Sequence, residues 1–206
     1  MKAKTTEPTT QWRDRCLGHF TTLRVPVQPG ALDELLTRAE KEHLSYLSFL
    51  DRLLGSEAGA RRERAVARRL HEARFPETKT LEGFDWSFNP QTFDRTQMEE
   101  LATGDFIRRR SHLVMVGWSG IGKSHILQAI GQQACVHGYR VRYQTSAQLL
   151  ADLTASLADK TLPTRLRHYA KPELLIIDEW GFDKIERNEC PEAAHLLYKI
   201  IAARNQ

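Results

Sequence analysis

One segment of the chain combines glycine, lysine and serine in the order that phosphate binding requires. Residues 117–124 read Gly-Trp-Ser-Gly-Ile-Gly-Lys-Ser, which fits the pattern G-x-x-x-x-G-K-[ST]. Glycines let the backbone approach phosphate oxygens, so that main-chain N–H groups face the negative charge. Lys123 places a cation on the β- and γ-phosphates, and the Ser124 hydroxyl is a hard ligand suited to Mg²⁺. The predicted nucleotide contacts are Gly117, Trp118, Ser119, Gly120, Ile121, Gly122, Lys123, Ser124 and His125.

The acidic pair Asp178-Glu179 is the second candidate for chemistry, and it follows the apolar run 174–177. Such a run is typical of a parallel strand buried on both faces, and ligands bind at the carboxyl ends of these strands. We predict that Asp178 and Ser124 hold Mg²⁺ and that Glu179 polarises a water for attack on the γ-phosphate. Glu179 and Lys123 are the predicted catalytic residues. The chain has no Asn-Lys-x-Asp guanine signature, which favours ATP over GTP.

The elements around these motifs alternate between strand and helix. Apolar runs predict strands at 112–117 and 174–178, and a short strand is predicted at 141–145. Helices are predicted from the capping residue Asp94 to about residue 110, at 123–137, from the capping residue Thr145 to about 157, at 163–170 and at 191–204. This alternation indicates an α/β fold with a parallel sheet and right-handed crossovers.

The first part of the chain shows helical patterns only. Helices are predicted at 11–23, 31–54 and 61–74, separated by the Pro- and Gly-containing segment 25–30 and by the glycines at positions 55 and 59. We therefore predict a small all-α domain over residues 1–78, followed by a nucleotide-binding core over residues 79–206.

Arginines gather on one face of the predicted helix 61–74. Arg61, Arg64 and Arg68 recur at steps of three and four, so they share that face. Two interpretations stay open, a face that contacts DNA phosphates and a solvated face of a packed helix. Arg165 and Arg167, before the acidic strand, are further candidates for contacts with a DNA backbone.

Composition sets several protein classes aside. The chain has 206 residues, of which 41% are hydrophobic and 27% charged, and its formal net charge is +4. No apolar run approaches the roughly 20 residues that span a bilayer, and the polar start is unlike a secretory signal. The three cysteines lack disulfide or metal-ligand spacing, which indicates a reducing compartment. We expect a cytoplasmic protein that does not associate with membranes.

From about residue 80 onward the chain resembles the AAA+ ATPases of the insertion-sequence helper type (IstB) and the related DnaC-type helicase loaders. The matching segments are Leu81-Glu82-Gly83-Phe84-Asp85, residues 101–107, the phosphate loop, residues 138–143 and residues 174–181. The leucine-rich helices before them look like the family's N-terminal domain. The resemblance implies a three-layer P-loop core of the AAA+ type.

The resemblance also implies a function. It suggests an ATP-hydrolysing protein that binds double-stranded DNA, self-associates into an oligomer and assists a transposase in target selection and integration. ATP and Mg²⁺ are the implied cofactors. Two alternatives remain open, a helicase loader of DNA replication and a truncated DNA-binding remnant that does not hydrolyse ATP.

The chain departs from the family pattern in three places. Trp118-Ser119 replaces the usual proline-rich pair of the loop, and Trp180 replaces an aliphatic residue after the acidic pair. The family core also has a strand between the phosphate-loop strand and the acidic strand, and no segment before Gln206 is predicted to supply it. We therefore expect a C-terminally truncated member, in which residues 1–206 alone hydrolyse ATP poorly.

Overall fold

The computed structural model describes residues 9–88, 90–181 and 192–205. The chain divides into two compact units, Met1–Ala65 and Val66–Gln206. The first unit is helical, and the second is helix-rich α/β with a small parallel sheet. The functional border predicted at residues 78 and 79 stays a prediction.

The first unit contains α1 (Thr9–Thr22), α2 (Pro29–Lys41) and the beginning of α3 (Tyr46–Ala73). The guanidinium of Arg13 on α1 donates to Asp33 on α2, with Nη2 2.7 Å from Oδ2. The prediction of one helix over 31–54 is wrong, because the chain turns between α2 and α3. His43 takes a φ of 50° there, and the N–H of Leu44 reaches back to the carbonyl of Ala39 at 3.0 Å. That backward bond closes the last turn of α2.

Helix α3 corrects a second prediction, that glycines separate two helices. It runs unbroken from Tyr46 to Ala73, with Gly55 and Gly59 inside it. A glycine inside a helix costs about 1 kcal/mol relative to alanine, which weakens the helix without breaking it. The long runs of helix-favouring residues on both sides offset that cost. The helix ends where Arg74 takes a φ of 60°.

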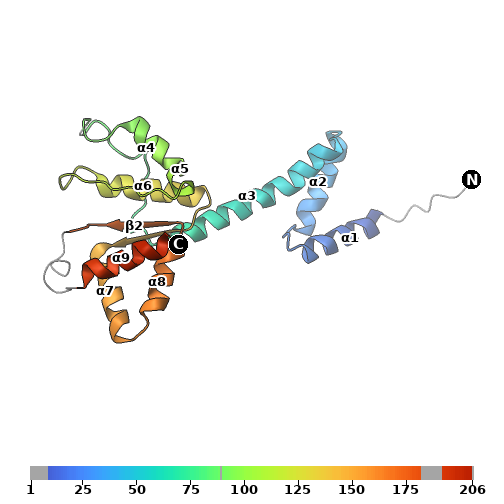
Figure 1. Ribbon diagram of the computed structural model, residues 1–206. Helices are drawn as coiled ribbons and strands as arrows, with labels where there is room; N and C mark the ends of the chain where they lie inside the picture. The colour runs from blue at the N-terminus through green and yellow to red at the C-terminus, as the bar shows by residue number, and fades with distance from the viewer. Residues whose placement is uncertain (1–8, 89, 182–191, 206) are drawn as a thin grey trace, which may run out of the picture. The chain divides into compact units, whose positions relative to one another are not determined.

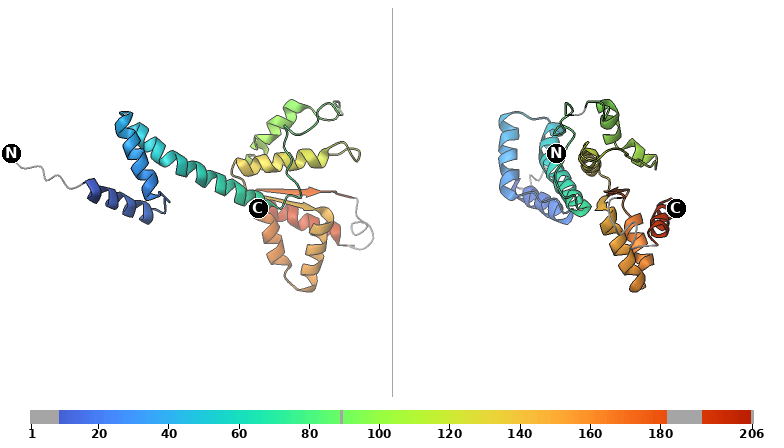
Figure 2. Two further views of the ribbon diagram at one scale, coloured as in Figure 1. Left: turned by 180° about the vertical axis from the view of Figure 1, so that it is seen from behind. Right: turned by 90° about the vertical axis from the view of Figure 1, so that its left-hand side faces the viewer.

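In the second unit, helices cover both faces of the sheet (Figures 1 and 2). Strands β1 (Val141–Thr145) and β2 (Leu174–Asp178) pair in parallel, with Tyr143 opposite Ile176. One face carries α4 (Arg95–Ala102), α5 (Asp105–Arg108) and α6 (Lys123–Val136), and the other carries α7 (Ser146–Ala158), α8 (Leu162–Ala170) and α9 (Ala193–Arg204). These three layers confirm the predicted α/β class.

Alternate residues of β2 serve the two faces, as the two-residue period of a strand requires. Ile176 packs in a cluster with Ala134 and Cys135 of α6. Leu175 and Ile177 pack instead against buried residues of α7, α8 and α9. The sheet is therefore buried on both sides, which explains why the run 174–177 is apolar throughout.

Capping residues set two of the helix starts as predicted. The carboxylate of Asp94 accepts from the N–H groups of Thr96 and Gln97. Thr145 and Gln148 form a reciprocal capping box at the start of α7. The helix predicted to run from Asp94 to about residue 110 is interrupted, because Gly104 adopts a φ of 81° between α4 and α5.

The strand predicted at 112–117 does not form within the described residues. Leu113 and Met115 pack beside a buried cluster that includes Ile126, whereas Val114 and Val116 are 80% and 90% exposed. Side chains therefore alternate as in an extended segment, but no ladder of hydrogen bonds is present. The reason is physical, because a strand needs a hydrogen-bonded neighbour and the only ladder among the described residues joins β1 to β2.

Candidate nucleotide-binding site

The predicted phosphate loop leads directly into the first turn of α6. Gly122 is the residue before the helix and has a φ of 97°, a conformation that favours glycine. The Nζ atom of Lys123 donates to the carbonyl oxygens of Gly117 and Trp118, at 2.9 and 2.7 Å. The lysine therefore folds back over the loop, close to the backbone that is predicted to surround the phosphates. The Trp118 side chain is 88% exposed.

A preceding segment packs against the end of this loop. The ring of Phe84 lies so close to Gly122 that a Cβ built there would be 2.6 Å from Cε2. The same ring meets His125 edge-on, with centroids 5.1 Å apart. His125 donates from Nε2 to the carbonyl oxygen of Thr80, at 2.9 Å. Residues 80–84 thus fix the start of α6, and the His125 side chain is engaged in that packing.

The second motif lies at the end of β2. Asp178 is the last residue of the strand and is 7% exposed. Its Oδ2 accepts from the hydroxyl of Tyr143 on β1 and its Oδ1 accepts from the N–H of Glu179, both at 2.8 Å. Burial and the neighbouring carboxylate raise the pKa of Tyr143 well above its usual range. The phenol therefore stays a hydrogen-bond donor at neutral pH.

Glu179 follows in an uncommon backbone conformation. Its φ is 57°, which costs about 1–2 kcal/mol for a residue with a side chain. Its N–H is held by Asp178, and its carbonyl oxygen accepts from Oγ of the buried Ser146 at 3.0 Å. The side chain itself is exposed. Bonds on both sides of the residue hold this turn, as expected where backbone strain serves a site.

Both motifs belong to the second unit and to elements that touch. A Cβ built on Gly131 of α6 would be 2.5 Å from Cδ1 of Ile176 on β2, so this helix lies directly on the acidic strand. Lys123 and Ser124 occupy the first turn of that helix. The sequence motifs did not identify Tyr143 of β1 or Ser146 at the start of α7, whose hydroxyl groups bond to Asp178 and Glu179.

The predicted DNA-contacting arginines have different surroundings. Arg61 and Arg64 are exposed, and neither has an ion pair with another described residue. Arg68 lies 4.0 Å from Glu72, whereas Arg165 lies 3.5 Å from Asp152. Arg167 donates to the carbonyl of Pro163 and to the hydroxyl of Thr164. Arg61 and Arg64 of α3 are therefore less engaged than Arg165 and Arg167 of α8.

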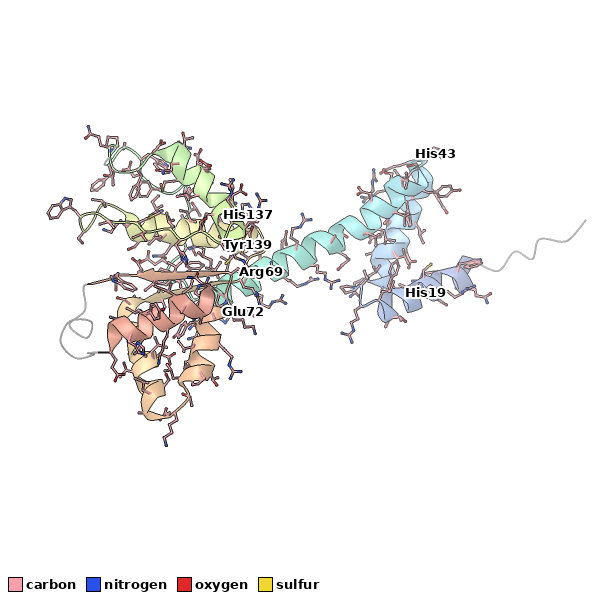
Figure 3. The ribbon with its side chains drawn as sticks, in the orientation of Figure 1. His19, His43, Arg69, Glu72, His137 and Tyr139 are labelled. Carbon is pink, nitrogen blue, oxygen red and sulfur yellow. The ribbon has the colours of Figure 1, made fainter. Side chains whose placement is uncertain are left out.

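One arginine of α3 has a packing role instead. Arg69 lies beside the turn that follows α6, where His137 and Tyr139 also lie (Figure 3). Its guanidinium would be 3.9 Å from a Cβ on Gly138. This last part of α3 belongs to the second unit, and the Arg69 side chain is half-buried there.

Two features are absent from the described part of the chain. No group of three or more His, Cys, Asp or Glu side chains with metal-binding geometry occurs there. None of the helices in those residues combines the length and the apolar character that crossing a membrane requires.

Known proteins resemble this chain over most of its length. A family profile described as IstB-like ATP binding protein matches residues 19–206. A relative from Geobacillus stearothermophilus, named as an ATP-binding protein of insertion sequence IS5376, is 32% identical over 93% of this chain and 74% of its own length. The corresponding protein of IS21 from Pseudomonas aeruginosa is 34% identical over 84% of this chain and 63% of its own.

A third relative has the same kind of name. It is an insertion-sequence ATP-binding protein from Mycobacterium tuberculosis, 30% identical over 89% of this chain and 71% of its own length. The chain thus spans 63% to 74% of these three relatives. Together with the loop before α6 and the acidic end of β2, these matches show that the chain belongs to the family of IstB-like ATP-binding proteins.

Proposed function

We propose that this chain binds and hydrolyses ATP with Mg²⁺ at the loop of residues 117–124 and the end of β2. The observation that carries the proposal is the position of Lys123. Its ammonium donates hydrogen bonds to the carbonyl oxygens of Gly117 and Trp118, and Lys123 is the first residue of α6, at the positive end of the helix dipole. A helix N-terminus, a glycine-rich loop before it and a lysine together favour a polyphosphate.

The donor groups in this unit fit Mg²⁺. Ser124 offers a hydroxyl and Asp178 a carboxylate, which are the hard oxygen ligands that Mg²⁺ prefers. Each Asp178 oxygen accepts one hydrogen bond and retains a second lone pair for a ligand. When bound, Mg²⁺ neutralises charge on the β- and γ-phosphates. Glu179, whose side chain is exposed beyond Asp178, is the proposed residue that orients the attacking water.

We further propose that the ATPase serves DNA transposition. The three relatives are named for insertion sequences, which associates this family with mobile elements. In the proposed function, the chain self-associates on double-stranded DNA and assists the transposase of its own element in selecting a target and integrating there. ATP binding favours the assembly, and hydrolysis releases it.

The exposed arginines of α3 are the proposed DNA contacts. Arg61, Arg64 and Arg68 lie at helical steps of three and four within one continuous helix. Arg61 and Arg64 are free of ion pairs with described residues, so phosphates can approach them without breaking an existing pair. Arg165 and Arg167 remain secondary candidates, because each already has a partner within α7 or α8.

The nucleotide site is tested with Lys123→Ala. This variant should lose ATP binding, measured by anisotropy of a fluorescent ATP analogue, because the cation that faces the phosphates is gone. Lys160→Ala, which removes an exposed lysine after α7, is the matched control and should bind as the wild type does. Equal ATP affinity in Lys123→Ala and wild type would reject the phosphate-loop assignment.

The DNA contacts are tested by changing Arg61, Arg64 and Arg68 to Gln together. DNA affinity should fall, and the slope of log affinity against log salt should become less negative by about 0.9 for each lost phosphate contact. A control variant changes Arg24, Arg38 and Lys41 to Gln, three exposed cations outside α3, which alters the net charge equally and should keep the wild-type slope. The measurement is anisotropy of a labelled duplex, with and without ATP and Mg²⁺. If both triple variants change the slope alike, the effect is net charge and the α3 contacts are rejected.

A further inference from the structure

A buried tyrosine lies directly behind the proposed metal ligand. The hydroxyl of Tyr143 donates to Oδ2 of Asp178 at 2.8 Å, although the two residues are 35 positions apart in the chain. The parallel register explains the meeting. Tyr143 pairs with Ile176, so the side chains of Tyr143 and Asp178 leave the same face of neighbouring strands.

The tyrosine is held in place from several sides. Tyr143 is 8% exposed and packs in a buried cluster that includes Cys135 of α6. The ring of Phe75 packs against it, with centroids 5.8 Å apart and planes inclined at 47°. A phenol fixed in this way points its hydroxyl in one direction. The bond to Asp178 therefore restricts the carboxylate more than a mobile donor would.

We infer that Tyr143 is a positioning residue, which orients the Asp178 carboxylate to ligate the Mg²⁺ of Mg²⁺–ATP. This inference rests on the proposed function. With the N–H of Glu179 on Oδ1 and the hydroxyl of Tyr143 on Oδ2, both carboxylate oxygens are held before the metal arrives. Such outer partners of metal ligands typically contribute 10–100-fold to metal affinity.

The chain offers a matched control for this bond. Tyr169, on the other face of the sheet, donates its hydroxyl to Oδ2 of Asp152, also at 2.8 Å. Tyr169 is 1% exposed, so its side chain is buried as that of Tyr143 is, although its bond to Asp152 is only partly buried. Neither Tyr169 nor Asp152 belongs to the proposed nucleotide site. Removing the Tyr169 hydroxyl shows the effect of losing a tyrosine–aspartate hydrogen bond in general. Any additional effect of removing the Tyr143 hydroxyl is then due to the position of the metal ligand Asp178.

The experiment compares wild type, Tyr143→Phe and Tyr169→Phe. The dissociation constant of a fluorescent ATP analogue is measured in EDTA and in saturating Mn²⁺. The dissociation constant in EDTA divided by that in Mn²⁺ reports how strongly the protein–nucleotide complex holds the metal, because nucleotide binding and metal binding are thermodynamically linked. In Tyr143→Phe the ratio should fall roughly 10-fold, while the constant in EDTA stays at the wild-type value. In Tyr169→Phe both constants should match the wild type.

The outcomes separate the inference from the proposed function. If wild type binds the analogue with Mn²⁺ and Tyr143→Phe shows the same ratio, the positioning role is wrong and the proposed site stands. If wild type binds no analogue, the proposed function fails and the inference fails with it. Should Tyr143→Phe not fold, Phe75→Leu keeps the hydroxyl but loosens the ring, and it should lower the ratio by a smaller factor. An unchanged ratio in Phe75→Leu would then overturn the inference.

Discussion

Replacing Gly122 with alanine should destabilise the protein through two separable effects. The first is conformational, because a φ of 97° costs a residue with a Cβ about 1–2 kcal/mol. The second is steric, because the new Cβ would be 2.6 Å from Cε2 and 3.0 Å from Cζ of Phe84. Phe84 packs against Trp86, Phe93 and His125, so it cannot move freely. Overpacking of this kind costs about 1–3 kcal/mol, and the expected total is about 2–5 kcal/mol.

Gly120→Ala is the control for the steric part. Gly120 also has a positive φ, of 81°, but a Cβ there would meet no atom within 4 Å. It should therefore show only the conformational cost of about 1–2 kcal/mol. The smaller entropy of the unfolded chain, which follows any change from glycine to alanine, is common to both variants and cancels. The free energy of unfolding is measured by urea denaturation with linear extrapolation.

The difference between the two variants decides the question. A difference of about 1–3 kcal/mol, with Gly122→Ala the less stable, supports the close packing of Phe84 on the loop. In the double variant Gly122→Ala with Phe84→Ala, the steric cost should vanish, so the two changes should be strongly non-additive. If Gly122→Ala and Gly120→Ala are equally stable, the reasoning from the Phe84 contact is refuted.

Two other predictions concern buried groups of the second unit. Burial raises the pKa of the Cys135 thiol to about 11, so at pH 8 little thiolate is present to react. Peptide mapping after iodoacetamide treatment should find the exposed Cys16 modified, and Cys135 protected until urea is added or the pH approaches 11. Rapid labelling of Cys135 at pH 8 would contradict its burial. The guanidinium of Arg204 on α9 donates to the carbonyls of Tyr169, Pro172 and Glu173. Arg204→Met should therefore lower the free energy of unfolding, measured in urea, by about 1.5–3 kcal/mol, whereas a loss below about 0.5 kcal/mol would show that these bonds do not anchor α9.

The sequence alone predicted the features whose information is local. The bounds of β1 and β2 were predicted from short local segments, apolar in β2, and the start of α7 followed from the Thr145 capping residue. The phosphate-loop and acidic motifs were also read directly, because each is a contiguous set of residues. The family profile over 19–206 confirmed the resemblance that these motifs carried. The roles of the individual site residues stay predictions.

Predictions failed where a local pattern had to be judged against its neighbours. Segment 112–117 has the composition of a strand, but a strand exists only when another backbone pairs with it. The leucine stripe over 31–54 continued across the turn that His43 makes. Gly55 and Gly59 suggested a break, yet the helix-favouring residues around them kept α3 continuous. In each case the deciding energy came from the surroundings of the pattern.

The sequence by itself determined which groups are candidates for binding a nucleotide, and only the tertiary structure decided how they are held. Glycine, lysine, serine and the two carboxylates follow from residue types in a fixed order. The bond from Tyr143 to Asp178 and the packing of Phe84 on Gly122 join residues 35 and 38 positions apart. No helical or strand period encodes such distant pairs, because they arise when the strand register and the packing of α6 bring separate segments together.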